Sequence, residues 1–371
     1  MNNKTKQNIK RWLKSLMSPF VVLSLFAFLV IGIIHRLTEG SRAFADLING
    51  SISQAFRRFM ASIGELFPFS LFELLIALLP IIIGVLIYRA VKVFSDPHKR
   101  LRFVANLLAL VLLIYSGHLL ALGVGHNTTS ISSEMGLTEV DVTEENLTET
   151  LTSLRDEINS LADQVPRDEN GVFTHGYSFE RLSREYSDSY IALAEQYGLP
   201  KGYYSTAKGI YVSEVMSYFG ISGIYSYVTG EANINTNYPD YVTTFTIAHE
   251  MSHQRGFMRE NEANFLAYIL TSTSEDPGIR YSGALNMYSY FASALYRTNK
   301  DAYFEIISEL SDYAVKDIRA ANAVSEKYGD TIFEEISDFI NDFYLTSSGS
   351  GGIISYSRVV ELVLAYRYGN N

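Results

Sequence analysis

Residues 249–265 read HEMSHQRGFMRENEANF and decide how the fold after residue 125 is interpreted. His249, Glu250 and His253 form the pattern H-E-x-x-H. On an α-helix, residues four apart lie about 40° apart around the axis and one turn along it, so both imidazoles can reach one metal ion. Neutral imidazole is the usual nitrogen ligand of zinc. Glu250 would lie beside the open coordination position, where it can take a proton from zinc-bound water. The stretch predicts a zinc site on a helix, with Glu250 as the general base.

A tetrahedral zinc site needs a third protein ligand, and two glutamates follow the second histidine. Gly256 can leave a helix through a left-handed position, so we expect a second helix to begin near Arg259. On that helix Glu260 shares a small, partly polar face with Asn264, whereas Glu262 shares a bulky apolar face. This placement favours Glu260 over Glu262 as the metal ligand. Asn264 could hydrogen-bond a ligating histidine, and Glu262 could instead pair with either arginine of the stretch.

The first 125 residues contain three long apolar runs with few charges, over residues 15–34, 67–88 and 103–124. Each run can cross a bilayer, which takes about 20 apolar residues. Runs of this length indicate membrane spans rather than buried helices of a soluble core. The triplet at residues 43–45 is similar to a signal-peptidase site but lies too far beyond the first run, so we expect a retained anchor. Glu73 and His118 fall inside the runs, either as functional groups or as interface and packing residues.

Lysine and arginine in the flanks predict the orientation of the spans. They are concentrated before the first run and between the second and third runs: Lys4, Lys6, Lys10, Arg11, Lys14, Arg89, Lys92, Lys99, Arg100 and Arg102. The loop between the first and second runs also holds four arginines, which is weaker evidence against this orientation. We expect a multi-pass protein of the cell membrane with a cytoplasmic N-terminus and an extracytoplasmic domain over residues 126–371.

Composition excludes several kinds of site. The net charge is −10 and no basic stripe is present, so nucleic acid is not an expected partner. The chain has no cysteine, which excludes disulfides, cysteine catalysis and thiolate metal sites. Residues 126–371 are expected to form an α-rich α+β domain, mainly helical with a small sheet. Helices over about 143–161 and 178–197 precede short strands within GIYVSEV and GIYSYVTGEANIN.

The motifs together resemble known zinc peptidases. HExxH followed by E-x-x-A-N is similar to the gluzincins, in which the ligand glutamate would fall on Glu260 and the following Asp/Asn on Asn264. The connection between the two helices is much shorter here. The three spans with TGEANIN, TIAHEMSHQRGFMRENEANFLAY, RYSG and SYSRVVEL resemble an uncharacterised bacterial family of membrane-anchored HExxH proteins. This resemblance implies a zincin-like metallopeptidase domain that binds Zn²⁺, without an established substrate.

Peptide hydrolysis would need further groups. Zincins usually place an edge strand above the motif helix, where an extended peptide adds as a further strand. GIYSYVTGEANIN is the candidate for this strand. Three polar residues alternate along one side of it, either as substrate contacts or as part of a polar loop: Glu231, Asn233 and Asn235. Tyr281 and Tyr356 are candidates to stabilise the oxyanion, with Arg358 as a possible clamp, and core packing is the competing explanation for both tyrosines.

The sequence therefore predicts a membrane-anchored zinc metallopeptidase whose partners are the lipid bilayer and a peptide or protein substrate. The alternative is a non-catalytic zinc-binding membrane protein of envelope assembly or sensing, which needs both motif histidines but not Glu250. A metal-free helical membrane protein is a third possibility. The four histidines outside the motif and the spans are expected to be ordinary loop or surface residues: His35, His98, His126 and His175.

Overall fold

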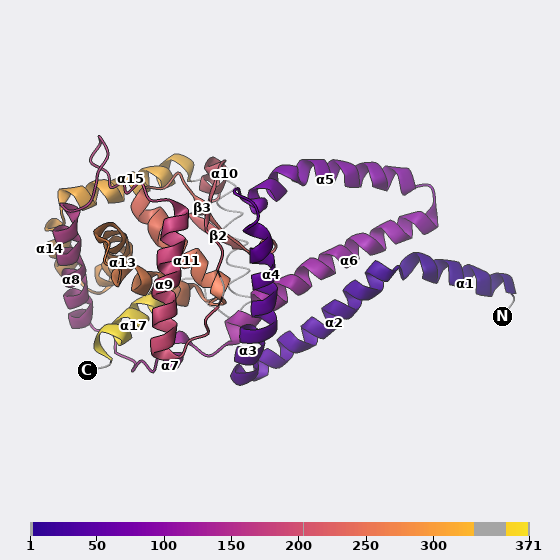
Figure 1. The fold of residues 1–371 in the computed structure, drawn as a ribbon, viewed down its shortest axis with the longest axis horizontal. Helices are drawn as coiled ribbons and strands as arrows, with labels where there is room; N and C mark the ends of the chain where they lie inside the picture. The colour runs from indigo at the N-terminus through magenta and orange to yellow at the C-terminus, as the bar shows by residue number, and fades with distance from the viewer. Residues whose placement is uncertain (1–2, 203, 330–353, 370–371) are drawn as a thin grey trace.

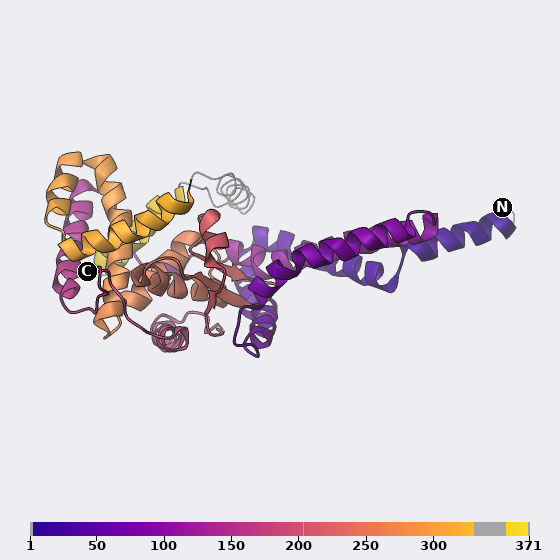
Figure 2. The same cartoon turned by 90° about the horizontal axis from the view of Figure 1, so that it is seen from above.

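The computed structural model of the chain describes residues 3–202, 204–329 and 354–369. Three apolar helices project from one end of a helical domain (Figure 1), and Figure 2 shows how far they extend beyond it. They are α2 (Pro19–Gly40), α5 (Leu71–Val93) and α6 (Pro97–Ala121), and each is long and apolar enough to cross a membrane. The three predicted runs are thus confirmed as long apolar helices, with bounds displaced by a few residues.

The three apolar helices differ in their packing. α2 and α6 lie side by side, and Ala105 and Ala109 of α6 are buried against Val21 of α2. α5 runs apart from them (Figure 1) and has no buried residue. α1 (Asn3–Leu16) precedes α2 at the end farthest from the helical domain. An apolar helix without buried side chains fits a lipid environment.

The segment between α2 and α5 is helical, which the sequence analysis did not predict. It forms α3 (Arg42–Ile48), the π-helical turn η1 (Asn49–Ser53) and α4 (Gln54–Gly64). α4 lies between the apolar helices and the helical domain and runs across their direction (Figure 1). Its Arg57 is only 2% exposed and donates to Asn49 Oδ1 and to the carbonyl oxygen of Ala121. This arginine therefore joins two elements internally and does not present its charge to a membrane surface.

The helical domain follows the 3-10 turn η2 (Gly123–Asn127), which leads out of α6. Its helices, in chain order, are α7 (Ile131–Glu134), α8 (Glu144–Ala162), α9 (Phe179–Tyr197), α10 (Ser213–Tyr218), α11 (Asp240–Arg255), α12 (Glu260–Ser272), α13 (Pro277–Thr298), α14 (Lys300–Ser308), α15 (Asp312–Tyr328) and α17 (Ile354–Tyr368). α13 packs against α8 on one side and against α11 and α12 on the other, so the main core surrounds it.

The two helices predicted before the motif are confirmed. α8 begins after Thr143, whose hydroxyl accepts a hydrogen bond from the amide of Asn146. Its predicted apolar stripe is buried in the core: Leu147, Leu151, Leu154, Ile158 and Leu161. α9 ends at Gly198, which adopts a left-handed conformation with φ 71°, as its sequence position predicted.

The small sheet lies next to the motif helix, and its strand order is β1-β3-β2. β1 (Lys208–Ile210) pairs parallel to β3 (Glu231–Asn235), and β2 (Gly223–Ser226) pairs antiparallel to β3. The predicted strand within GIYVSEV is confirmed only at its start, because β1 ends at Ile210 and α10 begins at Ser213. Within GIYSYVTGEANIN only β2 is at an edge of the sheet, and β3 is central.

The polar residues of β3 do not face a substrate cleft. Glu231, Asn233 and Asn235 are fully buried, with 0% exposure each. The Glu231 carboxylate accepts from the amides of Leu71 and Phe72 at the start of α5 and forms an ion pair with Lys208. Asn233 Oδ1 accepts from the Ser70 hydroxyl, and Asn235 donates to the Ser217 hydroxyl. Neither alternative for these residues is confirmed, because they lie in strand β3 rather than in a loop and their hydrogen bonds connect the sheet to α5 and α10.

Candidate metal centre

Helices α11 and α12 bring His249, His253 and Glu260 together. The two Nε2 atoms lie 3.1 Å apart, and the Glu260 carboxylate oxygens lie 3.3 Å from Nε2 of His249 and 3.6 Å from Nε2 of His253. Ligand atoms at 2.0–2.1 Å from a tetrahedral zinc ion would be about 3.3 Å from one another. In the described part of the chain, these three residues form the one His/Asp/Glu group close enough to hold a metal ion. The donor set and its spacing therefore fit zinc.

Hydrogen bonds orient both imidazoles toward the same point. His253 Nδ1 lies 2.7 Å from the carbonyl oxygen of Phe257, which can only accept, so Nδ1 carries the proton. His249 Nδ1 lies 2.9 Å from Asn264 Oδ1, and the same assignment applies there. When the rings are neutral, each Nε2 then keeps a lone pair for a metal ion beside the Glu260 carboxylate. Asn264 thus lies behind a histidine of the candidate metal group, where it could orient that ring.

Removing the Asn264 amide tests its orienting role. Asn264→Ala is expected to weaken zinc binding about 10–100-fold, the usual effect of losing a partner behind a metal ligand. Competition with a chromophoric chelator measures this affinity in the purified full-length protein. Asn286→Ala is a matched control, because that amide binds backbone carbonyls of Tyr241 and Ser282. An unchanged affinity for Asn264→Ala would show that Asn264 does not orient His249.

The turn between α11 and α12 explains how so short a connection can deliver Glu260. Gly256 ends α11 with φ 109°, and the amides of Gly256 and Phe257 bond back to the carbonyls of His253 and Ser252. α12 begins at Glu260 itself, with Arg259 as its N-cap. The chain therefore reverses within four residues, and the first residue of the second helix meets the histidines. The predicted stop at Gly256 and the second helix are both confirmed.

Glu262 faces away from the histidines. Its side chain is buried, pairs with Arg259 and accepts a hydrogen bond from the amide of Ile131 at 3.0 Å. Burial raises the pKa of Glu262, whereas Arg259 and the Ile131 amide favour its charged form. Burial would likewise raise the pKa of Glu260, but His253 and His249 lower it to about 2. Of the two glutamates, the structure places Glu260 at the histidines, and Glu262 takes the pairing with Arg259 that the sequence allowed.

Glu250 lies between the metal group and the edge of the sheet. Burial raises its pKa to about 7, although His249 partly offsets this effect. The edge strand β2 lies directly against it, because a Cβ atom on Gly223 would come within 2.7 Å of Glu250 Oε1. A hydrogen bond from the backbone of Tyr225 in β2 also lowers the Glu250 pKa. A carboxylate with a pKa near neutrality beside a metal site suits general acid–base chemistry.

Sequence reasoning missed His126, which was expected to be an ordinary loop or surface residue. It lies in η2, is only 9% exposed, and is one of the groups that lower the Glu260 pKa. Its carbonyl oxygen accepts from the Arg259 guanidinium at 3.1 Å. The prediction for His126 was wrong because its partners lie more than 120 residues away in the sequence. The only local signal was a histidine at the end of the third apolar run.

The structure does not bring Tyr281 to the metal group. This tyrosine is fully buried in α13, and its hydroxyl donates to Asp317 Oδ2, which also pairs with Arg167. Its contacts agree with the core-packing explanation. Tyr356 belongs to α17, but its side chain lies outside the described residues. Arg358, two residues further along α17, is exposed.

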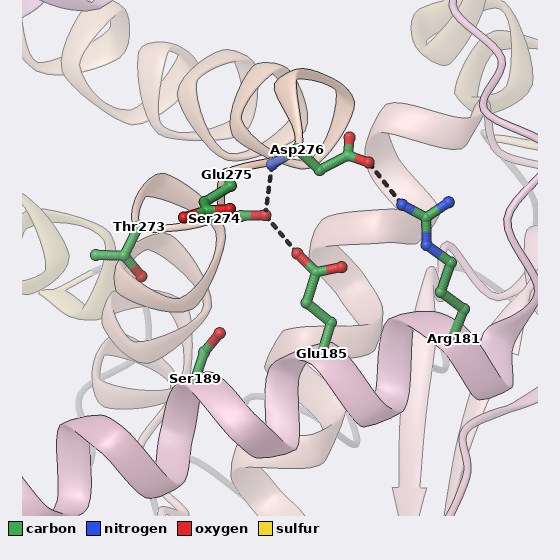
Figure 3. Close-up of a pocket in the computed structure, with 7 residues that line it drawn as sticks. All are labelled: Arg181, Glu185, Ser189, Thr273, Ser274, Glu275 and Asp276. Atoms are coloured by element: carbon green, nitrogen blue, oxygen red, sulfur yellow. Dashed lines mark hydrogen bonds and ion pairs between the residues drawn. The ribbon is translucent and has the colours of Figure 1, made fainter.

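A separate pocket lies between α9 and the α12–α13 turn (Figure 3). It is lined by Arg181, Glu185, Ser189, Thr273, Ser274, Glu275 and Asp276. Figure 3 shows its polar groups bound to one another: Arg181 pairs with Asp276 at 2.7 Å, and the Ser274 hydroxyl donates to Glu185. Asp276 also accepts from the amides at the start of α13. These groups serve as a helix cap and its supports, so the pocket offers no chemistry comparable to the metal centre.

Comparison with known proteins gives a family but no activity. The model of a family described as "protein of unknown function (DUF3810)" matches residues 49–364. The chain belongs to this family. No curated protein and no solved structure matches the chain. The region matched by DUF3810 extends from η1 through α5 and α6 to α17, so it includes apolar helices together with the metal centre.

Proposed function

We propose that the chain is a membrane-anchored zinc metallopeptidase. The observation that carries the proposal is the triad of His249, His253 and Glu260 at zinc-ligand spacing, with Glu250 buried beside it. A bound zinc ion would lower the pKa of a water ligand and polarise a peptide carbonyl. Glu250 would accept the proton of that water and pass it to the leaving amine. The three nitrogen and oxygen ligands leave the fourth tetrahedral position for water, as catalytic zinc sites do.

The edge strand supports a polypeptide substrate. The Asn235 amide donates to the carbonyl oxygen of Ser222, so these two residues form a hydrogen-bonded pair. Hydrogen-bonded and non-hydrogen-bonded pairs alternate along an antiparallel ladder. The backbone N–H and C=O groups of Gly223 and Tyr225 therefore point away from β3. The Tyr225 amide already donates to Glu250, so the backbone groups of Gly223 and the carbonyl of Tyr225 are the groups offered to a peptide beside Glu250. An extended peptide that pairs with this edge would be held by main-chain hydrogen bonds beside the general base.

The three apolar helices and their flanking charges support the proposed orientation. The ends of α2, α5 and α6 that lie away from the helical domain carry the basic clusters of the sequence. Positive residues favour the cytoplasmic face. We therefore place the N-terminus and the α5–α6 turn in the cytoplasm, and the metal centre with the helical domain outside.

Metal content and hydrolysis test the proposal together. Full-length protein purified in detergent is expected to contain one zinc ion per chain and to cleave an unfolded protein such as reduced casein. A chelator should stop cleavage, and added zinc should restore it. If the purified protein contains no zinc, and added zinc leaves its melting temperature unchanged, the zinc assignment fails. Zinc binding without cleavage would favour the alternative, a non-catalytic zinc protein of envelope assembly or sensing.

A further inference from the structure

The metal centre is fastened to the ends of the apolar helices. Asn49 of η1 donates to the carbonyl oxygen of Gly256, the residue that ends the motif helix. The Arg57 guanidinium lies against the same glycine, where a Cβ atom would come within 2.5 Å of Nη2. Arg57 also donates to the carbonyl of Ala121, the last residue of α6. The turn that brings Glu260 to the histidines is therefore held by the end of a proposed span.

The edge strand leads directly to the same helix. Tyr227, the first residue after β2, donates its hydroxyl to the carbonyl of Ile114 in α6 at 3.2 Å. Its ring also packs against Gly117 and lies edge-on to His118. Gly223, four residues earlier, lies against Glu250. Four residues of extended chain span about 13 Å. Measured along β2, Glu250 is therefore within about this distance of Tyr227.

Tyr227 marks the level at which α6 leaves the apolar environment. The exposed apolar side chains of α6 end at Ile114 and Tyr115, and the residues of the following two turns are buried or half-buried. Tyrosine is enriched where a span meets the headgroups. The boundary of the bilayer would thus be close to Tyr115 and Tyr227, and the edge strand β2 ends at that boundary.

Exposed apolar side chains also lie around the start of α5, where a second span would meet the bilayer boundary. The Glu73 carboxylate, in the first turn of α5, accepts from the amides of Tyr211 and Val212. These two side chains are 94% and 50% exposed. Leu66, in the connection into α5, is 77% exposed. Large apolar side chains exposed beside a span are suited to contact lipid.

We infer that the metal centre acts on extended polypeptide segments that lie at the membrane surface, next to a membrane anchor. This inference rests on the proposed peptidase function and names its class of substrate. A polypeptide paired antiparallel with β2 would have its N-terminal part at the bilayer boundary and its scissile bond beside Glu250. Contact of Tyr211, Leu66 and Tyr227 with lipid would set the distance between the edge strand β2 and the bilayer.

The depth of labelled residues relative to the bilayer tests the proposed lipid contact independently of peptidase activity. Because the natural chain has no cysteine, single cysteines can be labelled in the full-length protein in lipid nanodiscs. Val228, the residue after Tyr227, is exposed. An environment-sensitive fluorophore at Tyr211→Cys or Val228→Cys should emit at shorter wavelength and be quenched by headgroup-labelled lipid. Tyr296→Cys, near the distant α14, is a control for water, and Val85→Cys in α5 is a control for lipid. If labels at 211 and 228 behave like the label at 296, the inference is wrong whatever the activity.

The position of cleavage tests the substrate class. The probe is a synthetic single-span polypeptide whose extracytoplasmic tail repeats one unstructured sequence that the protein cleaves when free in solution. The cuts should fall in the copies within about ten residues of the bilayer, a length that spans about 33 Å when extended. Equal cleavage of near and far copies would overturn the inference and leave the peptidase function standing. If the zinc-loaded protein cleaves no peptide at all, the proposed function fails and the substrate class with it, whereas the depth labels still decide the lipid contact.

Discussion

Replacement of Glu250 by glutamine is expected to abolish measurable peptide hydrolysis while one zinc ion per chain remains bound. The amide cannot accept the proton of the attacking water, and a general base contributes about 10²–10⁴-fold to such reactions. Both imidazoles and Glu260 keep their places, because none of their hydrogen bonds involves the Glu250 side chain. Zinc content by mass spectrometry and the cleavage rate of one peptide measure the two effects separately.

A second glutamate provides the control for this substitution. Glu180 is exposed on α9 and pairs only with Arg184 among the contacts that the structure gives it, so Glu180→Gln removes a surface ion pair of small energetic value. It should leave both zinc content and cleavage unchanged. Retention of cleavage, or full rescue of a deletion strain, by Glu250→Gln would contradict the catalytic role. That result would favour the non-catalytic zinc protein.

Local sequence patterns were sufficient to predict the motif helix and its turn. The H-E-x-x-H spacing, the left-handed position of Gly256 and the two faces of α12 depend on residues within about four positions of one another. Helix geometry and sterics act at that range. The same short-range geometry favoured Glu260 over Glu262, and Glu260 is the one of these two glutamates that lies beside the histidines. The apolar runs could also be predicted, because length and hydropathy decide whether a helix can cross a bilayer.

Contacts between distant segments could not be predicted in this way. His126 approaches Glu260 because η2 packs on the metal turn, where Gly125 lies against Met258. Glu231 was interpreted from its alternation in a strand, but its partners are amides at the start of α5, about 160 residues earlier. Alternation states which side of a strand a residue occupies but not which element covers that side. Tyr281 is a similar case, because its partner Asp317 belongs to another helix.

Paired substitutions of the two glutamates are expected to have opposite consequences. Glu260→Gln should weaken zinc binding by more than the about 10–100-fold typical of losing a residue behind a ligand, because a charged ligand itself is lost. Glu262→Gln should keep one zinc ion per chain at nearly unchanged affinity, because Glu262 points toward Arg259 and Ile131. Zinc titration of both variants against a competing chelator measures this difference.

The same pair separates metal binding from folding. Glu262→Gln leaves the largely buried Arg259 without a carboxylate, and breaking a buried ion pair lowers the free energy of unfolding by about 3–5 kcal/mol. Glu260→Gln should instead lose the stabilisation that zinc gives the folded state and behave like wild-type protein treated with chelator. Thermal unfolding with and without zinc measures both effects. Equal zinc affinities in the two variants would refute Glu260 as the third ligand. The metal centre would then consist of the two histidines and a group outside α12, for which His126 of η2, whose charge acts on Glu260, is a candidate.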